Sequence, residues 1–318
     1  MRLPRSTRPF QVNRLKISHL RLITALADTG SIQAAADNLL ISQPAASRQA
    51  AEIEKIIGRE IHRRAGKGIE LTEAGRALAY RARRALQEID DAGREIQELG
   101  EGITGQVNLG AVTGPAIEHI LPVLQTARKA MPGIKIAVEV ATSDVLGNLL
   151  LDGRLDFMLA RRPPDHQPSL FSERPITSEP LCLIVGKKHP LLQKTQATTV
   201  DLLNFDWVLP VEGTLLHRTL EDALRQRGLS LPDQIYHTSS FLLTMALVQK
   251  SNAIAPIADA VARVFAADSS GPLRVLNSDL NVSVETFSMI KRADQMFTPA
   301  AQAIYDMTLQ HLKAHIQA

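Results

Sequence analysis

Four side chains around residue 45 are spaced to share one face of a helix. Gln43 and Ser47 are four residues apart, as are Pro44 and Arg48, and residues four apart are neighbours on a helix surface. Gln, Ser and Arg side chains can hydrogen-bond to base edges or to phosphate oxygens. Ser42 precedes the set as an N-cap, and a helix N-terminus itself favours a phosphate. The pattern therefore predicts a helix that contacts double-stranded DNA near its N-terminus.

Two shorter helices are predicted before this one. Ser18 and Ser31 are suitable N-caps, and Gly30 provides a stop between the first helix and the second. Because the connections are so short, the helices must cross steeply, which is typical of a helix-turn-helix. A small alanine-rich helical bundle without a DNA-binding role would show the same pattern. The residues that can pack between the helices are Leu22, Ile23, Leu26, Ala27, Ala34, Ala35, Leu39, Leu40, Ala46, Ala50, Ile53 and Ile57.

A basic hairpin is predicted over residues 61–72. Two short apolar ends flank a glycine-bracketed turn over residues 65–68, which is typical of a β-hairpin. Arg63, Arg64 and Lys67 would then lie where a wing meets the phosphate backbone or enters a minor groove. An ordinary solvated turn would explain the same charges.

The charge of the chain is divided unevenly. Residues 1–70 hold 12 Lys and Arg against 6 Asp and Glu, a net charge of +6, whereas the remaining residues hold 24 against 27, a net charge of −3. The positive charge is therefore confined to the segment with the predicted helix-turn-helix, where release of counterions from DNA would favour binding.

Small and apolar residues recur with alternating steps of four and three along residues 71–99. Such a heptad pattern predicts a long linker helix over 73–100 that forms a coiled coil with a second copy. A dimer of this kind would present two recognition helices to a two-fold symmetric site. The alternative is a long amphipathic helix packed on its own domain. The series is Leu71, Gly75, Leu78, Ala82, Ala85, Ile89, Ala92, Ile96 and Leu99.

After a glycine-rich hinge at 100–105, strands alternate with helices, which favours parallel sheets covered by helices. Two α/β lobes are expected, one formed by about 106–163 with 282–318 and the other by about 181–277. The predicted strands are 106–112, 134–140, 156–160, 181–186, 207–209, 234–238, 253–256 and 282–291, and the predicted helices are 117–130, 144–151 and 299–316.

Folds of this kind bind ligands in a crevice outside the carboxyl ends of the strands. Polar side chains at those places are candidates for binding a small-molecule effector. Taken singly, each of them is equally well explained as a helix cap or a turn residue. The candidates are Thr113, Thr142, Ser143, Arg161, Glu212, Thr214, Ser239 and Ser240.

The N-terminal sequence resembles the DNA-binding domain of LysR-type transcriptional regulators. The resemblance is carried by LKISHLRLITALADTGSIQAAADNLLISQPAASRQAAEIEKIIG and RRAGKGIELTEAGRAL, which contain the SQPAASRQ recognition helix and the LTEAG that opens the linker. It implies an α/β protein with a winged helix-turn-helix over 15–72, a dimerisation helix over 73–100 and a two-lobed effector domain over 101–318, similar to periplasmic binding proteins.

The resemblance also implies roles for residues. Gln43, Pro44, Ser47 and Arg48 would face the major groove or its phosphates, and Ser31 would anchor a phosphate. Arg63, Arg64 and Lys67 would serve the wing. Further implied partners are a second copy, a tetramer of copies, RNA polymerase and a small metabolite.

Two segments bear on how far the resemblance extends. His62 stands where the family usually has an aromatic residue before the wing, which puts the packing of the wing in question. Residues 248–256 replace a glycine-rich stretch of many members. Together with residues 211–221, they resemble a branch that responds to sugars or to aromatic acids from plant material. A sugar, a sugar acid or an aromatic acid is therefore the expected effector.

Several other classes of protein are disfavoured. Cys182, the one cysteine, lies in an apolar strand and predicts a buried structural thiol, and the nine histidines show no metal-ligand spacing. No catalytic or nucleotide-binding motif, no apolar span and no secretory signal is found, so no enzyme activity, cofactor or metal is expected and the location is expected to be cytoplasmic.

The extension 1–14 is expected to be a disordered tail, with a basic arm as the alternative. The competing function is a small-molecule-binding protein or hydrolase with an incidental helical N-terminus.

Overall fold

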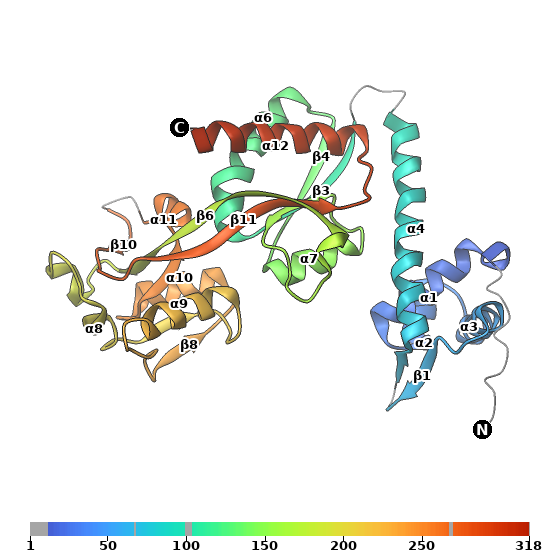
Figure 1. Ribbon diagram of the computed structural model, residues 1–318, viewed down its shortest axis with the longest axis horizontal. Coiled ribbons are helices and arrows are strands. Elements are labelled where there is room, and N and C mark those ends of the chain that lie inside the picture. The colour runs from blue at the N-terminus through green and yellow to red at the C-terminus, as the bar shows by residue number, and fades with distance from the viewer. Residues whose placement is uncertain (1–11, 67, 99–103, 267–269, 318) are drawn as a thin grey trace. The chain divides into compact units, whose positions relative to one another are not determined.

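The computed structural model describes residues 12–66, 68–98, 104–266 and 270–317 (Figure 1). The chain forms two compact units, one containing residues 1–105 with 151–154 and the other 106–150 with 155–318. The expectations for residues 1–11 and for Lys67 lie outside the described residues, as do those for residues 99–103.

The first unit contains three helices, a two-stranded hairpin and one long helix. These elements are a 3₁₀ turn (Val12–Arg14), α1 (Ile17–Thr29), α2 (Ile32–Asn38), α3 (Gln43–Ile57), β1 (His62–Ala65), β2 (Gly68–Leu71) and α4 (Glu73–Glu98). Leu22, Leu26 and Ile53 are fully or almost fully buried between the helices together with Ala35 and Ala46. The predicted helix-turn-helix and the predicted hairpin are both present.

Local caps define the ends of the helices. Ser31 and Ser42 each accept a hydrogen bond, from the N–H of Ala34 and of Ala45 respectively. Gly30 ends α1 in the left-handed conformation with φ of 60°. The expected cap at Ser18 is wrong, because α1 begins at Ile17 and the ring of His19 accepts a hydrogen bond from the N–H of Lys16 instead.

Two of the expected core residues, Ala27 and Leu40, are exposed and do not face the core. Leu40 is 94% exposed and adopts φ of 55°, since the turn between α2 and α3 turns its side chain outward. On α3, Ile57 is half-buried and packs against the core as expected, and Ile56 beside it is buried.

Helix α4 packs on its own domain only along its first half. Ala79 and Ala82 are buried against the three helices, and a Cβ on Gly75 would lie 1.9 Å from the carbonyl oxygen of Ile61, so this approach requires glycine. Further along, Ile89 is 49% and Ile96 71% exposed. The alternative of a helix on its own domain therefore describes the first half of the heptad series, whereas the second half leaves its apolar positions uncovered.

The second unit begins with a β-α-β-α-β run, which forms most of its first lobe. Its elements are β3 (Gly105–Ala111), α5 (Thr113–Pro115), the π-helical turn η2 (Ala116–Ile120), α6 (Leu121–Ala130), β4 (Ile134–Val140), α7 (Ser143–Leu151) and β5 (Phe157–Ala160). α5, η2 and α6 follow one another without a break, so the helix expected at 117–130 begins four residues earlier.

The remainder of the unit forms the second lobe and returns to the first. Its elements are 3₁₀ turns at Pro168–Leu170 and Pro190–Gln193, β6 (Phe171–Gly186), α8 (Thr199–Leu202), β7 (Trp207–Leu209), α9 (Leu215–Arg225), β8 (Ile235–His237), α10 (Phe241–Lys250), β9 (Ala255–Ala258), α11 (Asp259–Phe265), β10 (Leu273–Leu276), β11 (Val282–Arg292) and α12 (Pro299–Gln317). Figure 1 shows β6 and β11 running side by side along the length of both lobes.

The main sheet is mixed, and this corrects the expectation of parallel sheets. Its strand order is β10-β6-β11-β5-β3-β4, and β9 pairs with β6. β3 and β5 are parallel, but β11 is antiparallel to both β5 and β6. The strand expected at 181–186 is only the end of β6, which begins at Phe171 because residues 171–181 pair with β11. β7 and β8 form a separate parallel pair.

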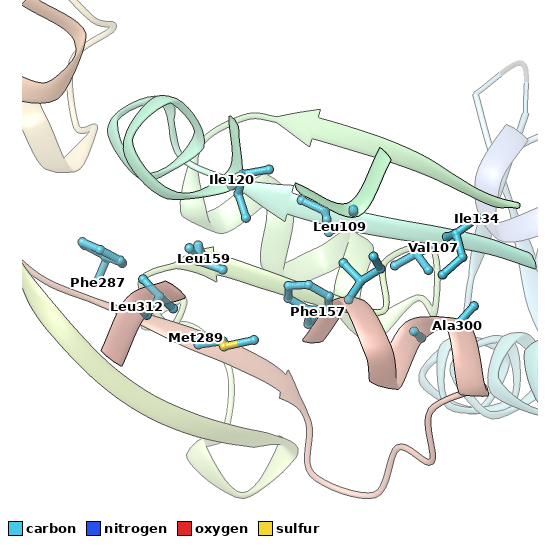
Figure 2. Packing of buried hydrophobic residues seen from close by; sticks show 14 residues of the cluster. Val107, Leu109, Ile120, Ile134, Phe157, Leu159, Phe287, Met289, Ala300 and Leu312 are labelled. Atoms are coloured by element: carbon cyan, nitrogen blue, oxygen red, sulfur yellow. The ribbon is translucent and has the colours of Figure 1, made fainter. Parts of the chain in front are cut away.

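Each lobe of this unit has its own apolar core packed against the sheet. In the first lobe, Phe157, Leu159 and Met289 from the strands meet Ile120 and Leu312 from the helices (Figure 2). In the second lobe a core forms around the fully buried Trp207. The side chain of Cys182 is half-buried on β6, less enclosed than expected, and burial raises the pKa of its thiol to about 12. No helix within the described ranges has the length and apolar composition that a bilayer crossing requires.

Candidate DNA-binding surface and effector cleft

The N-terminal half of α3 presents the polar face that the spacing predicts. Gln43, Pro44 and Arg48 are exposed, and Ser47 is half-buried. The Gln43 amide donates to the Ser47 hydroxyl at 3.3 Å, which aligns the two side chains on one face. On the other side of the helix, Ala46, Ala50 and Ile53 are buried in the domain, so the polar face is directed away from the core.

The wing is fixed to the helices by backbone contacts. The N–H of Ile69 donates to the carbonyl oxygen of Gly30 at 2.8 Å, and a Cβ on Gly68 would lie 2.6 Å from the same oxygen. His62 lies on the strand that leads into the turn, with its Nδ1 3.2 Å from a carboxylate oxygen of Glu54 on α3. The ring of His62 therefore lies beside the Glu54 carboxylate, at the position where the family usually has an aromatic residue.

The wing arginines differ in their surroundings. Arg63 is paired with Glu70 across the hairpin at 2.8 Å, so its charge is partly neutralised. Arg64 lies opposite Ile69 and is exposed. Ser31 is half-buried at the start of α2, where its hydroxyl caps the helix.

In the first lobe, two of the candidate effector residues meet. The backbone N–H of Arg161, at the end of β5, donates to the hydroxyl of Ser143 at 3.1 Å. The Arg161 side chain is buried, with Nε donating to the carbonyl oxygen of Glu285 and Nη2 to Glu179, both at 2.8 Å. Thr142 is exposed beside this group, and its carbonyl oxygen accepts the first hydrogen bond of α7.

Glu179 is a member of this group that the sequence interpretation missed. It lies on a stretch of β6 for which no element was predicted, so its position next to Arg161 had no signal in the sequence. A Cβ on Gly114 would lie 1.9 Å from Glu179 Oε1 and 2.9 Å from the Cβ of Ala258 on β9. The start of α5, which also carries the exposed Thr113, therefore packs closely against both the Glu179 carboxylate and Ala258 of the second lobe.

The candidates of the second lobe form a separate group. Thr214 precedes α9, and its hydroxyl donates to the carbonyl oxygen of Val211 at 2.9 Å. Glu212 is exposed, with a carboxylate oxygen 3.9 Å from Nε2 of His237. Ser240 caps α10 by accepting from the N–H of Leu243, and Ser239 is exposed before it. The capping interpretation therefore describes Ser240 correctly.

A hollow of about 450 Å³ lies elsewhere, between α9 and β11. None of the eight candidate residues lines it, although its lining includes Glu285, whose carbonyl oxygen accepts from Arg161. Across the described part of the chain, no set of three or more His, Cys, Asp and Glu side chains is arranged to hold a metal ion. The residues lining the hollow include Arg218, Asp222, Gln226, Ser283 and Glu285.

Comparison with known proteins gives two matches to protein families. Residues 17–76 match the bacterial regulatory helix-turn-helix of the LysR family, and residues 100–313 match the LysR substrate binding domain. Because both segments match, the N-terminal helices are not an incidental addition to a small-molecule-binding domain or hydrolase.

Relatives and solved structures agree with this assignment. The transcriptional regulator GbpR of Rhizobium radiobacter is 42% identical over 82% of this chain and 89% of its own length. GbpR of Azospirillum brasilense is 33% identical over 91% of this chain and 84% of its own length. A full-length CbnR in complex with its target DNA shares the fold, with a TM-score of 0.63 at 21% identity over 94% of this chain and 99% of its own. The chain belongs to the LysR family of transcriptional regulators, which bind DNA and sense a small molecule through the substrate-binding domain.

Proposed function

We propose that α3 reads the target DNA through Gln43, Pro44, Ser47 and Arg48. The exposed polar face and the basic N-terminal segment support this assignment, since an amide can pair with a base edge while a guanidinium holds a phosphate or a guanine. The N-terminus of α2 at Ser31 and that of α3 at Ser42 would each hold a phosphate of the backbone.

The wing would contact the flanking DNA backbone. Arg64 is the stronger candidate within the described hairpin, because it is exposed and Arg63 is already paired with Glu70. Arg63 would contribute after exchanging Glu70 for a phosphate. Lys67, which lies between the two strands in the sequence, would add a third positive charge.

The distal half of α4 would join two copies of the chain. Ile89 and Ile96 continue the heptad series but are exposed, and exposed apolar positions at this spacing favour a coiled coil. Such a dimer would bind a two-fold symmetric promoter site in the cytoplasm, with assembly to a tetramer and contact with RNA polymerase as further steps.

The effector would bind where Thr113, Thr142, Ser143 and Arg161 adjoin the second lobe. The ion pair between Arg161 and Glu179 is the observation that indicates the chemical class of the effector. Because the buried guanidinium is already balanced by a carboxylate, an added anion would find no unpaired positive charge there to offset the cost of leaving water. A neutral polyhydroxylated ligand could instead donate hydroxyl protons to Glu179 and accept from Ser143. A sugar is therefore favoured over a sugar acid or an aromatic acid.

A thermal-shift screen of the full chain tests this choice. Neutral sugars, the matching sugar acids and aromatic acids would be compared at equal concentration, and ligand at 100 times its Kd adds roughly 2.7 kcal/mol of apparent stability. Stabilisation by a neutral sugar that Ser143→Ala weakens and Thr126→Ala leaves unchanged supports the proposal. Stabilisation by acids alone would refute it.

A further inference from the structure

Three histidines that are far apart in the sequence meet in the first lobe. His119 lies on the π-helical turn η2, and His311 and His315 lie one turn apart on α12. The ring centroid of His119 is 5.6 Å from that of His311 and 5.0 Å from that of His315, and the two α12 rings are 6.2 Å apart. We call His119, His311 and His315 the histidine cluster.

His119 is buried without a hydrogen-bond partner. Its side chain is 1% exposed, and neither ring nitrogen has a partner among the described residues. Nε2 of His311 is also buried and unpartnered. A buried polar atom without a partner is costly, and a buried charge is costlier. Burial, together with the neighbouring His315, His311 and Arg263, lowers the pKa of His119 to about 4.

The charged groups around the cluster come from two elements, η2 and α11. Glu118, next to His119 on η2, lies with Oε2 3.8 Å from Nε2 of His119 and with Oε1 3.4 Å from Nε2 of His315. Arg263 on α11 donates to the same Glu118 carboxylate and also pairs with Asp259 at 3.4 Å. Glu118 therefore stands between the histidines and Arg263.

The ion pair of Glu118 with Arg263 joins the two lobes. Glu118 belongs to the first lobe, and Arg263 belongs to a helix that follows β9 in the second. η2 also continues directly from α5, whose Gly114 approaches Ala258 at the end of β9. A change of charge at His119 thus acts on a contact between the lobes and on the helix that borders the effector cleft. π-helical turns of this kind occur frequently at functional sites.

We propose that the histidine cluster and the pair of Glu118 with Arg263 form a proton-sensitive latch between the lobes of the effector domain. When protons bind, the positive imidazoles repel Arg263 and compete with it for the Glu118 carboxylate. The contact between the lobes then loosens. The effector domain would therefore respond to acidification as a second signal, in addition to its ligand.

Hydrogen–deuterium exchange of the full chain at pH 7.5 and 5.5, corrected for intrinsic exchange rates, tests the latch without effector or DNA. In the wild type, exchange in η2 and α11 should rise about tenfold at the lower pH. The reason is that pH 5.5 lies one unit below the ordinary histidine pKa, so the population of an open state in which the histidine has that ordinary pKa rises by about this factor. His119→Gln should lose this response. His315→Gln, at a half-exposed position that does not endanger folding, should reduce it.

Two further variants sharpen the result. Arg263→Gln should exchange fast in α11 at both pH values, because the latch is already open. His166→Gln, which removes a histidine from the surface of the first lobe, should keep the wild-type response. Equal responses of exchange to pH in the wild type and in both cluster variants would overturn the latch. A response that disappears when EDTA is added would also overturn it, because the cluster would then be a site for a divalent metal. Neither result would affect the proposed binding of DNA or effector, since no ligand is used.

Discussion

The carbonyl oxygen of Gly30 accepts a hydrogen bond from the N–H of Ile69 at 2.8 Å. This bond joins the residue that ends α1 to the second strand of the wing and fixes the position of the wing relative to the three helices. The contact is close enough that the neighbouring Gly68 has no space for a side chain.

Gly68→Ala should therefore detach the wing. The added Cβ would lie 2.6 Å from the Gly30 oxygen, and such overpacking typically costs about 1–3 kcal/mol. Urea unfolding should show this loss, and DNA affinity should fall with it. Gly93→Ala provides the control, since a Cβ there meets nothing within 4 Å and alanine favours a helix. Equal stability of the Gly68 variant and the wild type would contradict the close contact.

Leu40→Asn should stabilise the protein. Leu40 has φ of 55° and is 94% exposed, so it has backbone strain of roughly 1–2 kcal/mol and almost no burial to offset it. Asparagine tolerates this conformation better, and a gain of about 1 kcal/mol in the free energy of unfolding is expected. Leu39→Asn should destabilise, because Leu39 packs partly against the core. The same sign of change at both positions would argue against strain at Leu40.

Arg48→Ala and Gln43→Ala should weaken DNA binding in different ways. Loss of a phosphate contact at Arg48 should reduce affinity on all sequences and lower the salt slope by about 1, whereas loss of a base contact at Gln43 should cost about 1–3 kcal/mol on the preferred site only. Gel retardation on native and single-base-changed promoter fragments at several salt concentrations separates the two effects. Lys55→Ala, at the far end of the same helix, is the matched control.

Ile89→Glu combined with Ile96→Glu should abolish the dimer. Both side chains are exposed on α4 in the single chain, so charge there should leave the fold of each copy intact and disrupt only the coiled coil. Light scattering reports the mass directly. Asp90→Lys, off the heptad positions, should leave the mass unchanged, and a dimer that survives the double substitution would exclude this helix as the main interface.

Burial of His119 should make stability depend on pH. Its pKa in the folded chain, about 4, lies below the ordinary value of 6.5, so the unfolded chain binds the proton more strongly. Stability is therefore fully present above pH 6.5 and is lost as the pH falls towards 4, by at most about 3 kcal/mol. His119→Phe should remove this part of the dependence. Urea unfolding followed by the fluorescence of the buried Trp207 measures it, and parallel pH profiles for the two proteins would contradict the assignment.

The sequence predicts most of the first unit because its signals are local. Ser31, Ser42 and Gly30 act within a few residues of their own positions, and each is found in the predicted role. Strands β4 and β7 likewise match their predicted bounds, since apolar runs and flanking turn residues define them.

The missed features depend on partners that are distant in the chain. Pro175 and Pro180 argue against a strand, yet β6 continues through them because it pairs with β11 across a shift in register. Glu179 lies in that stretch, so its contact with Arg161 could not be inferred. The same is true of His119, whose neighbours on α12 follow almost 200 residues later.

The long pairing of β6 with β11 also has a consequence for how the effector domain can be divided. Both strands run through both lobes, so each lobe by itself contains only a part of β6 and a part of β11. A fragment carrying one lobe alone would expose an unpaired strand, which is a template for aggregation. The two lobes therefore have to be produced together, in one fragment that carries the whole of β6 and β11.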